Sequence, residues 1–168
     1  MTQTNIVVLA LAPFIMWRVY KRVQRLTVRQ KSRPWRHWAA ALLFPVMLVT
    51  LAALFSAMPQ ALAAIAGGTA VGGLLALIAL RRTGFERIGS DYFYTPYAPI
   101  GITIAMLFIG RMLYRGYEFY AFGAQNTPQF GSSPLTMLIV GTLAGYYMAY
   151  AIGLLRWRAA ERALEVKA

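Results

Sequence analysis

The chain has 168 residues, 59% of them hydrophobic, and carries 17 Lys and Arg residues against five Asp and Glu. Soluble globular domains are about 45 to 50% apolar, so a water-soluble fold would expose too much hydrophobic surface. The net charge of +12 indicates nucleic acid or an anionic membrane surface as a partner. Because the basic residues stand at the ends of long apolar runs, we expect anionic lipids and no nucleic acid.

The first apolar run, residues 5–20, has no basic residue before it and a dense basic cluster after it. This order is the reverse of a secretory signal peptide and predicts a membrane-spanning helix that starts outside. The basic loop 18–36 contains no acidic residue, and its arginine spacing predicts an amphipathic helix on lipid headgroups. A solvated cytoplasmic loop is the alternative. The headgroup-binding arginines are Arg18, Arg22, Arg25 and Arg29.

Four further apolar runs predict spans over residues 37–58, 61–80, 98–115 and 134–155. Residues 81–97 are predicted to form a cytoplasmic loop, in which Gly89 and Ser90 separate two apolar stretches in the pattern of a small β-hairpin. The aromatic residues of this loop are predicted to form a belt at the membrane interface. They are Tyr92, Phe93, Tyr94 and Tyr97. Residues 116–133 are predicted to form an external loop.

Fifteen of the 17 basic residues fall on one side of this arrangement. The positive-inside rule then places the N-terminus outside and the C-terminus inside. The sequence therefore predicts an all-α fold, in which residues 1–168 form one membrane domain. The domain is a helical bundle of about five spans in the bacterial inner membrane.

Small residues recur every four positions along two of the predicted spans. In lipid, such faces let helix backbones approach closely, which matters because apolar burial alone no longer drives helices together. We expect these two helices to run parallel and to pack on each other, with self-association of the chain as the alternative. The residues are Ala64, Gly68, Gly72 and Ala76 in one helix and Gly141, Gly145, Ala149 and Gly153 in the other.

Charged residues interrupt the predicted span 98–115. Arg111 and Arg115 lie one turn apart, and Glu118 follows Arg115 by three, so all three can share one helix face. A charged residue inside a membrane segment indicates a functional site by default. The alternative is that Arg111 extends to the headgroups while Glu118 neutralises Arg115. The pattern leaves both open.

No residues have the spacing of a catalytic, cofactor or metal site. His37 is the only histidine and cannot build a three-ligand zinc site or a bis-His haem site by itself. Glu86 and Asp91 are the carboxylates best placed to cooperate, but their loop also contains three arginines, which favours ion pairing. Phosphate-binding glycine loops, nucleophile elbows and HExxH are absent from the sequence. We therefore predict a protein that is not an enzyme and uses no cofactor.

Two segments carry a resemblance to a known family. Residues 73–86 end in Arg-Thr-Gly-Phe-Glu, and residues 92–115 contain Tyr-Thr-Pro and end in Gly-Arg-Met-Leu-Tyr-Arg. Over about residues 5–115, the chain resembles the CcdC-like family of bacterial multi-pass membrane proteins, a domain of unknown function. The resemblance implies a bacterial membrane protein without an assigned catalytic role. The last span and the lack of cysteine depart from the family pattern.

The resemblance and the intramembrane charge coincide in one stretch of the chain, which we take as the candidate functional face. Its residues are Thr83, Phe85, Glu86, Arg111, Arg115 and Glu118. We expect an accessory or scaffold protein whose partner is another membrane protein or a second copy of the chain. A small transporter or an oligomeric channel is the alternative.

Overall fold

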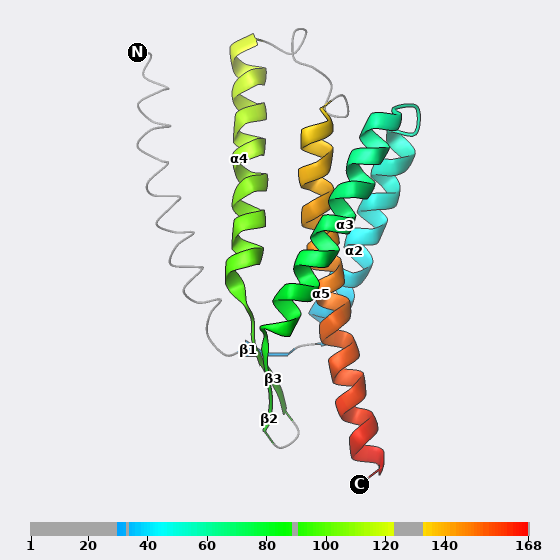
Figure 1. Ribbon diagram of the computed structural model, residues 1–168, viewed down its shortest axis with the longest axis vertical. Coiled ribbons are helices and arrows are strands. Elements are labelled where there is room, and N and C mark those ends of the chain that lie inside the picture. The colour runs from blue at the N-terminus through cyan, green and yellow to red at the C-terminus, as the bar shows by residue number, and fades with distance from the viewer. Residues whose placement is uncertain (1–29, 33, 89–90, 123–132, 168) are drawn as a thin grey trace, which may run out of the picture.

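A computed structural model describes residues 30–32, 34–88, 91–122 and 133–167 of the chain. Most of these residues belong to four long helices (Figure 1). The helices are α2 (Pro34–Leu54), α3 (Pro59–Arg81), α4 (Ala98–Phe122) and α5 (Pro134–Lys167).

Each of the four helices contains a segment long and apolar enough to cross a membrane. These segments are His37–Leu54, Pro59–Arg81, Ala98–Ala121 and Pro134–Ala163. The predicted helical fold is therefore confirmed, and the four apolar helices fit the prediction of a membrane protein. The predicted span 5–20 lies outside the described residues, so the count of five spans stays a prediction.

A small three-stranded sheet lies at one end of the helices (Figure 1). Its strands are β1 (Gln30–Lys31), β2 (Gly84–Ile88) and β3 (Asp91–Thr95). β3 is the central strand and is antiparallel to both neighbours. β2 and β3 form the hairpin predicted within residues 81–97, with Glu86 opposite Phe93. β1 was not predicted from the sequence. Because of the three-stranded sheet, the described part of the chain is not purely helical.

The helices alternate in direction, so that α2 and α4 lead away from the sheet while α3 and α5 lead toward it (Figure 1). α5 has 34 residues and is about 51 Å long, whereas a bilayer core is about 30 Å thick. Its C-terminal part therefore continues past the end of α3 and runs beside the sheet. Two predicted boundaries are corrected: α5 extends twelve residues beyond 155, and residues 116–122 are helical rather than part of an external loop.

α3 and α5 are in close backbone contact along their shared length. A Cβ added at Gly68 would lie 2.9 Å from the backbone nitrogen of Thr142, and one at Gly72 would lie 2.7 Å from that of Tyr146. The contact is mutual, because a Cβ at Gly145 would lie 2.8 Å from Cα of Thr69. These positions leave no room for a side chain, so glycine is required for the two helices to lie this close.

α2 and α4 pack on opposite parts of this pair. α2 places Leu48 and Leu51 against Ile65 and Met137, near the end remote from the sheet. α4 contributes Ile104, which is buried with residues of α3 and α5. Both outer helices therefore depend on the α3–α5 pair for most of their packing within the described residues.

We predict that Gly68→Leu destabilises the protein strongly, whereas Gly67→Leu does not. The new side chain at position 68 would collide with the backbone of α5, and overpacking of this kind costs about 1–3 kcal/mol or more. A Cβ at Gly67 would meet nothing within 4 Å, so the neighbouring substitution is a matched control on the same helix. Thermal unfolding of the purified proteins in detergent measures the difference. Equal melting temperatures for both variants would contradict the observed α3–α5 contact.

Candidate functional site

Thr83 connects the end of α3 to α5. Its buried hydroxyl donates to the carbonyl oxygen of Ala79 at 2.8 Å. Because that proton is used, the hydroxyl of Tyr150 on α5 donates to Thr83 Oγ1, at 2.9 Å. The residue directly before β2 is thus anchored to both helices, which fixes where the sheet begins.

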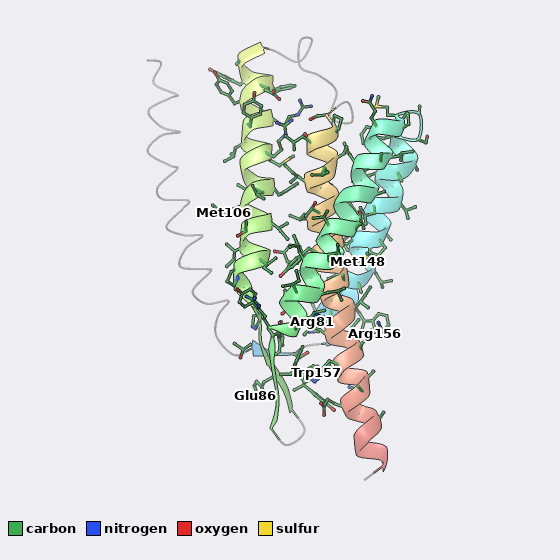
Figure 2. All side chains as sticks on the ribbon, in the orientation of Figure 1. Arg81, Glu86, Met106, Met148, Arg156 and Trp157 are labelled. Atoms are coloured by element: carbon green, nitrogen blue, oxygen red, sulfur yellow. The ribbon has the colours of Figure 1, made fainter. Side chains whose placement is uncertain are left out.

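The hairpin packs against α5 through aromatic rings. Trp157 lies with its ring centroid 4.6 Å from that of Phe85 on β2 and 5.7 Å from that of Tyr92 on β3. Figure 2 shows Trp157 between α5 and the hairpin, and Glu86 on the hairpin at the same end of the molecule. Phe85 and Tyr92 therefore lie on the sheet face that contacts α5.

Arg158 on α5 contacts both β3 and the residue that follows β1. Its side chain is only 8% exposed, and its guanidinium carbon lies 4.7 Å from the ring centroid of Tyr92. The same guanidinium donates from Nη1 to the carbonyl oxygen of Ser32, just after β1. A cation on an aromatic face is most favourable when water is excluded. We call the sheet together with α5 from Arg156 onward the head.

His37, at the start of α2, is also tied to the head. The histidine is buried, its Nε2 lies 3.1 Å from Oγ of Ser32, and its ring meets the edge of Tyr94 at 5.8 Å between centroids. Ser32 in turn donates its backbone N–H to the carbonyl oxygen of Tyr92. One short segment after β1 therefore binds α2, α5 and β3.

These contacts correct the predicted aromatic belt. Tyr92 is buried against Trp157 and Arg158, so its ring stabilises the head and does not face lipid, whereas Tyr94 is half-buried and packs on His37. Trp35 and Trp38 near the start of α2 are exposed, as residues of an interfacial belt are.

Arg111 links α4 to the start of α5. Its Nε donates to Oγ1 of Thr136 at 3.0 Å, and its Nη2 donates to Oγ of Ser133 at 2.8 Å. The guanidinium carbon also lies 5.4 Å from the ring centroid of Tyr114 on the same helix. Two nitrogens of the Arg111 guanidinium therefore bind hydroxyl groups of the protein. The alternative prediction, in which this side chain only extends to the lipid headgroups, does not describe these contacts.

Arg115 and Glu118 form an ion pair on the same helix, with 3.0 Å between Nη1 and Oε2. Both side chains are largely shielded from solvent. Their spacing of three residues predicts that the two side chains lie on the same face of the helix. Because the charges neutralise each other, this part of α4 is less costly to place near lipid.

The structure divides the six candidate residues into two groups. Thr83, Phe85 and Glu86 lie at the sheet end, whereas Arg111 lies about 20 Å along α4 from Ala98, in the direction away from the sheet. The six residues therefore do not form one face.

Of the other predicted positions, the eight small residues lie on α3 and α5. Glycines 68 and 72 are buried against α5, and glycines 141 and 145 are buried against α3. The predicted headgroup arginines at 18, 22, 25 and 29 lie outside the described residues.

Sequence reasoning missed Arg158 and Ser32. Arg158 was counted only as a cytoplasmic charge, and Ser32 follows a strand too short to show any periodicity. No local sequence pattern identifies the contact, because Arg158 binds Tyr92 and Ser32, which are distant in sequence.

Within the described part of the chain, no group of three or more His, Asp or Glu residues is placed to hold a metal ion. In the same residues, every buried side-chain nitrogen and oxygen has a hydrogen-bond partner. The buried polar groups described above therefore contribute to the fold, as satisfied buried polar groups generally do.

The comparisons with known proteins agree with the resemblance seen in the sequence. A family model described as CcdC protein matches residues 1–162. The chain belongs to the CcdC protein family. The match to the CcdC family extends well beyond the predicted 5–115 and includes most of α5, so the last span is not a departure from the family. Comparison with curated proteins and with solved structures gave no match.

We predict that Arg111→Lys loosens the contact between α4 and α5. A lysine ammonium cannot reproduce a planar fork that reaches two hydroxyls three residues apart, and losing one hydrogen bond to a charged group costs about 1.5–3 kcal/mol. The matched control is Arg115→Lys, because Arg115 pairs with the carboxylate of Glu118 and a lysine can pair with it too. Thermal unfolding in detergent is the measurement. If Arg111→Lys is as stable as the parent, the two hydroxyl contacts do not hold α4 in place.

Proposed function

We propose that this protein is a non-enzymatic accessory protein of the bacterial inner membrane, which uses its head to hold a membrane partner. The observation that carries the proposal is the burial of Arg158 between Tyr92 and Ser32. This contact joins three separate segments of the chain outside the helical core. It makes the head a fixed extension of α5 and not a loose loop, which is what a docking surface requires.

The proposed topology has five spans, with the N-terminus outside and the head in the cytoplasm. Exposed arginines gather at the sheet end: Arg156 and Arg162 belong to the head, and Arg81 and Arg82 lie where α3 leads into β2, directly beside it. Figure 2 shows Arg81 and Arg156 at this level of the molecule. Positive residues of short loops stay in the cytoplasm, which supports this orientation. A span over 5–20 would add the fifth crossing.

The same arginines support anionic lipids as a second class of partner. Arg82 donates to the hydroxyl of Tyr97 at 3.2 Å and lies over its ring, so its position beside the start of α4 is defined. Basic residues near an anionic surface each contribute about 1 kcal/mol of attraction. Lipid binding would hold the head close to the membrane plane, next to a partner embedded in the same bilayer.

Holding rather than catalysis is supported by how the buried polar groups are used. The hydrogen bonds of Thr83, Tyr150 and Ser32 connect one element of the fold to another. A catalytic centre instead gathers acids, bases or nucleophiles around a space for substrate.

A small transporter or oligomeric channel is the second candidate, and Arg111 is the observation that favours it. A charge within a membrane segment frequently marks a path for ions or substrates. Flux of a solute into proteoliposomes that contain only this protein would support transport and would contradict the accessory role.

We predict that affinity purification in mild detergent recovers one membrane protein in near-stoichiometric amount with the parent chain. Recovery of that protein should fall by about tenfold with Arg158→Ala, because loss of the buried contact costs about 1.5–3 kcal/mol and releases the head. The control is Arg162→Lys, one turn further along α5 and exposed, which keeps the positive charge that favours anionic lipid. A parent chain that purifies alone, or an equal loss of the partner with both variants, would contradict the proposal.

A further inference from the structure

Arg111 carries a positive charge that no acidic side chain of the protein is left to neutralise. The sequence has five acidic residues, and one of them, Glu118, forms the ion pair with Arg115. The other four lie at the opposite end of the molecule, on the hairpin or in the C-terminal part of α5 (Figure 1). They are Glu86, Asp91, Glu161 and Glu165. The counter-charge of Arg111 therefore has to come from outside the chain.

The protein contacts of Arg111 occupy one edge of its planar guanidinium group. Nε and Nη2 lie along that edge and donate to the hydroxyls of Thr136 and Ser133, at 3.0 and 2.8 Å. Nη1 and the second N–H of Nη2 form another edge with two donors. Among the described residues, no oxygen accepts from this second edge. Two donors side by side in this way bind two oxygens of one phosphate or carboxylate group.

The groups around Arg111 favour an anion. Thr136 is fully buried, and α5 has no acidic residue in its first turn, which begins at Pro134. The start of a helix carries a partial positive charge, so it adds to the charge of the arginine instead of cancelling it. Arg111 is only partly buried, so part of its side chain is accessible from outside the protein. Because an unpaired charge in a membrane segment is costly, this position favours a ligand with negatively charged oxygens.

Exposed side chains along α4 change in character at the level of Arg111. Toward the sheet they are mainly aliphatic, as at Leu107 and Ile109. Beyond Arg111 they are mainly aromatic, as at Tyr117 and Tyr120. Aromatic residues gather where acyl chains meet headgroups, so Arg111 lies at the depth of lipid phosphates. The acyl chains of a lipid bound there would cover the exposed aliphatic side chains, which a free ion would leave uncovered.

We propose that Arg111, Ser133 and Thr136 form a binding site for a phosphate group, carried by a lipid of the leaflet remote from the head. The second edge of the guanidinium donates to two phosphate oxygens, while the two hydroxyls hold the guanidinium in orientation. The site is therefore formed by two helices and is not one flexible side chain among headgroups. It rests on the membrane location in the proposed function, but it is separate from the head and needs no protein partner.

Lipid binding to the full-length protein tests this site. The protein is purified and freed of lipid in dodecyl maltoside, and native mass spectrometry measures the dissociation constant of the first bound lipid. Phosphatidylethanolamine is compared with a diacylglycerol of the same acyl chains, which lacks the phosphate. Phosphatidylethanolamine has no net charge, so attraction to the basic head adds little. Inorganic phosphate is added as a competitor.

We expect the parent protein to bind phosphatidylethanolamine about tenfold more tightly than the diacylglycerol, and Arg111→Gln to lose this preference. The ratio of the two dissociation constants is the readout, because a general loosening of the fold would weaken both lipids. The matched control is the double variant Arg115→Gln and Glu118→Gln, which removes a neighbouring ion pair without changing the net charge. This control should keep the preference.

Three results would overturn the proposal. The parent protein could bind both lipids equally, or Arg111→Gln could retain the preference of the parent. In either case Arg111 does not bind the phosphate of the lipid. Displacement of phosphatidylethanolamine by millimolar inorganic phosphate would instead assign the site to free phosphate and reject the lipid.

Ser133→Ala keeps the test decisive if Arg111→Gln does not accumulate. This variant retains the charge of Arg111 but removes one of the two hydroxyls that orient the guanidinium, so the preference for phosphatidylethanolamine should fall several-fold. An unchanged preference would overturn the proposal. The partner of the head is tested separately by affinity purification, so failure of one experiment does not decide the other.

Discussion

The close approach of α3 and α5 is the constraint on which the other elements depend. Glycines at 68 and 72 on one helix and at 141 and 145 on the other bring the two backbones into contact. In lipid, where apolar burial gives little drive for association, such contact provides the dispersion energy that holds helices together. Ile104 of α4 and Leu48 of α2 then pack on surfaces that this pair creates.

α5 connects the helical core to the head. The same helix that supplies Gly141 and Gly145 to the core supplies Tyr150 to Thr83, and then Trp157 and Arg158 to the sheet. A three-stranded sheet of this size is marginal on its own, because it buries too little apolar surface. Its stability therefore depends on a helix whose position is set about 20 Å away, inside the bundle.

Much of this arrangement follows from short-range sequence patterns. The hairpin was predictable from Gly89 and Ser90 between two apolar stretches, and the helices were predictable from the length of their apolar runs. Other features depend on tertiary contacts. β1 has only two residues and is a strand only because β3 is beside it. The Arg115–Glu118 pair follows from its spacing, but the partners of Arg111, Ser133 and Thr136, are more than twenty residues away and are not revealed by the linear sequence.

The candidate site illustrates the same division. The glycine spacing identified the residues between α3 and α5, since a repeat of four marks one helix face. The role of Arg158 was hidden, because its partners Ser32 and Tyr92 are far away in sequence and a basic residue near a helix end is already expected from the positive-inside rule. Tyr92 was predicted to belong to an aromatic belt at the membrane interface, because aromatic residues next to a span commonly do, although it packs inside the head.

Hydrogen exchange of the hairpin, measured by mass spectrometry, tests most directly whether α5 couples the helical core to the head. The amides of β2 and β3 are compared in the parent, in Gly68→Leu and in Gly67→Leu. If the head depends on the α3–α5 contact, amide exchange in residues 84–95 accelerates with Gly68→Leu, which disturbs that contact at a distance, and is unchanged with Gly67→Leu. Unchanged exchange in both variants, with Gly68→Leu still destabilised in its helices, would show that the head is stable independently of the core.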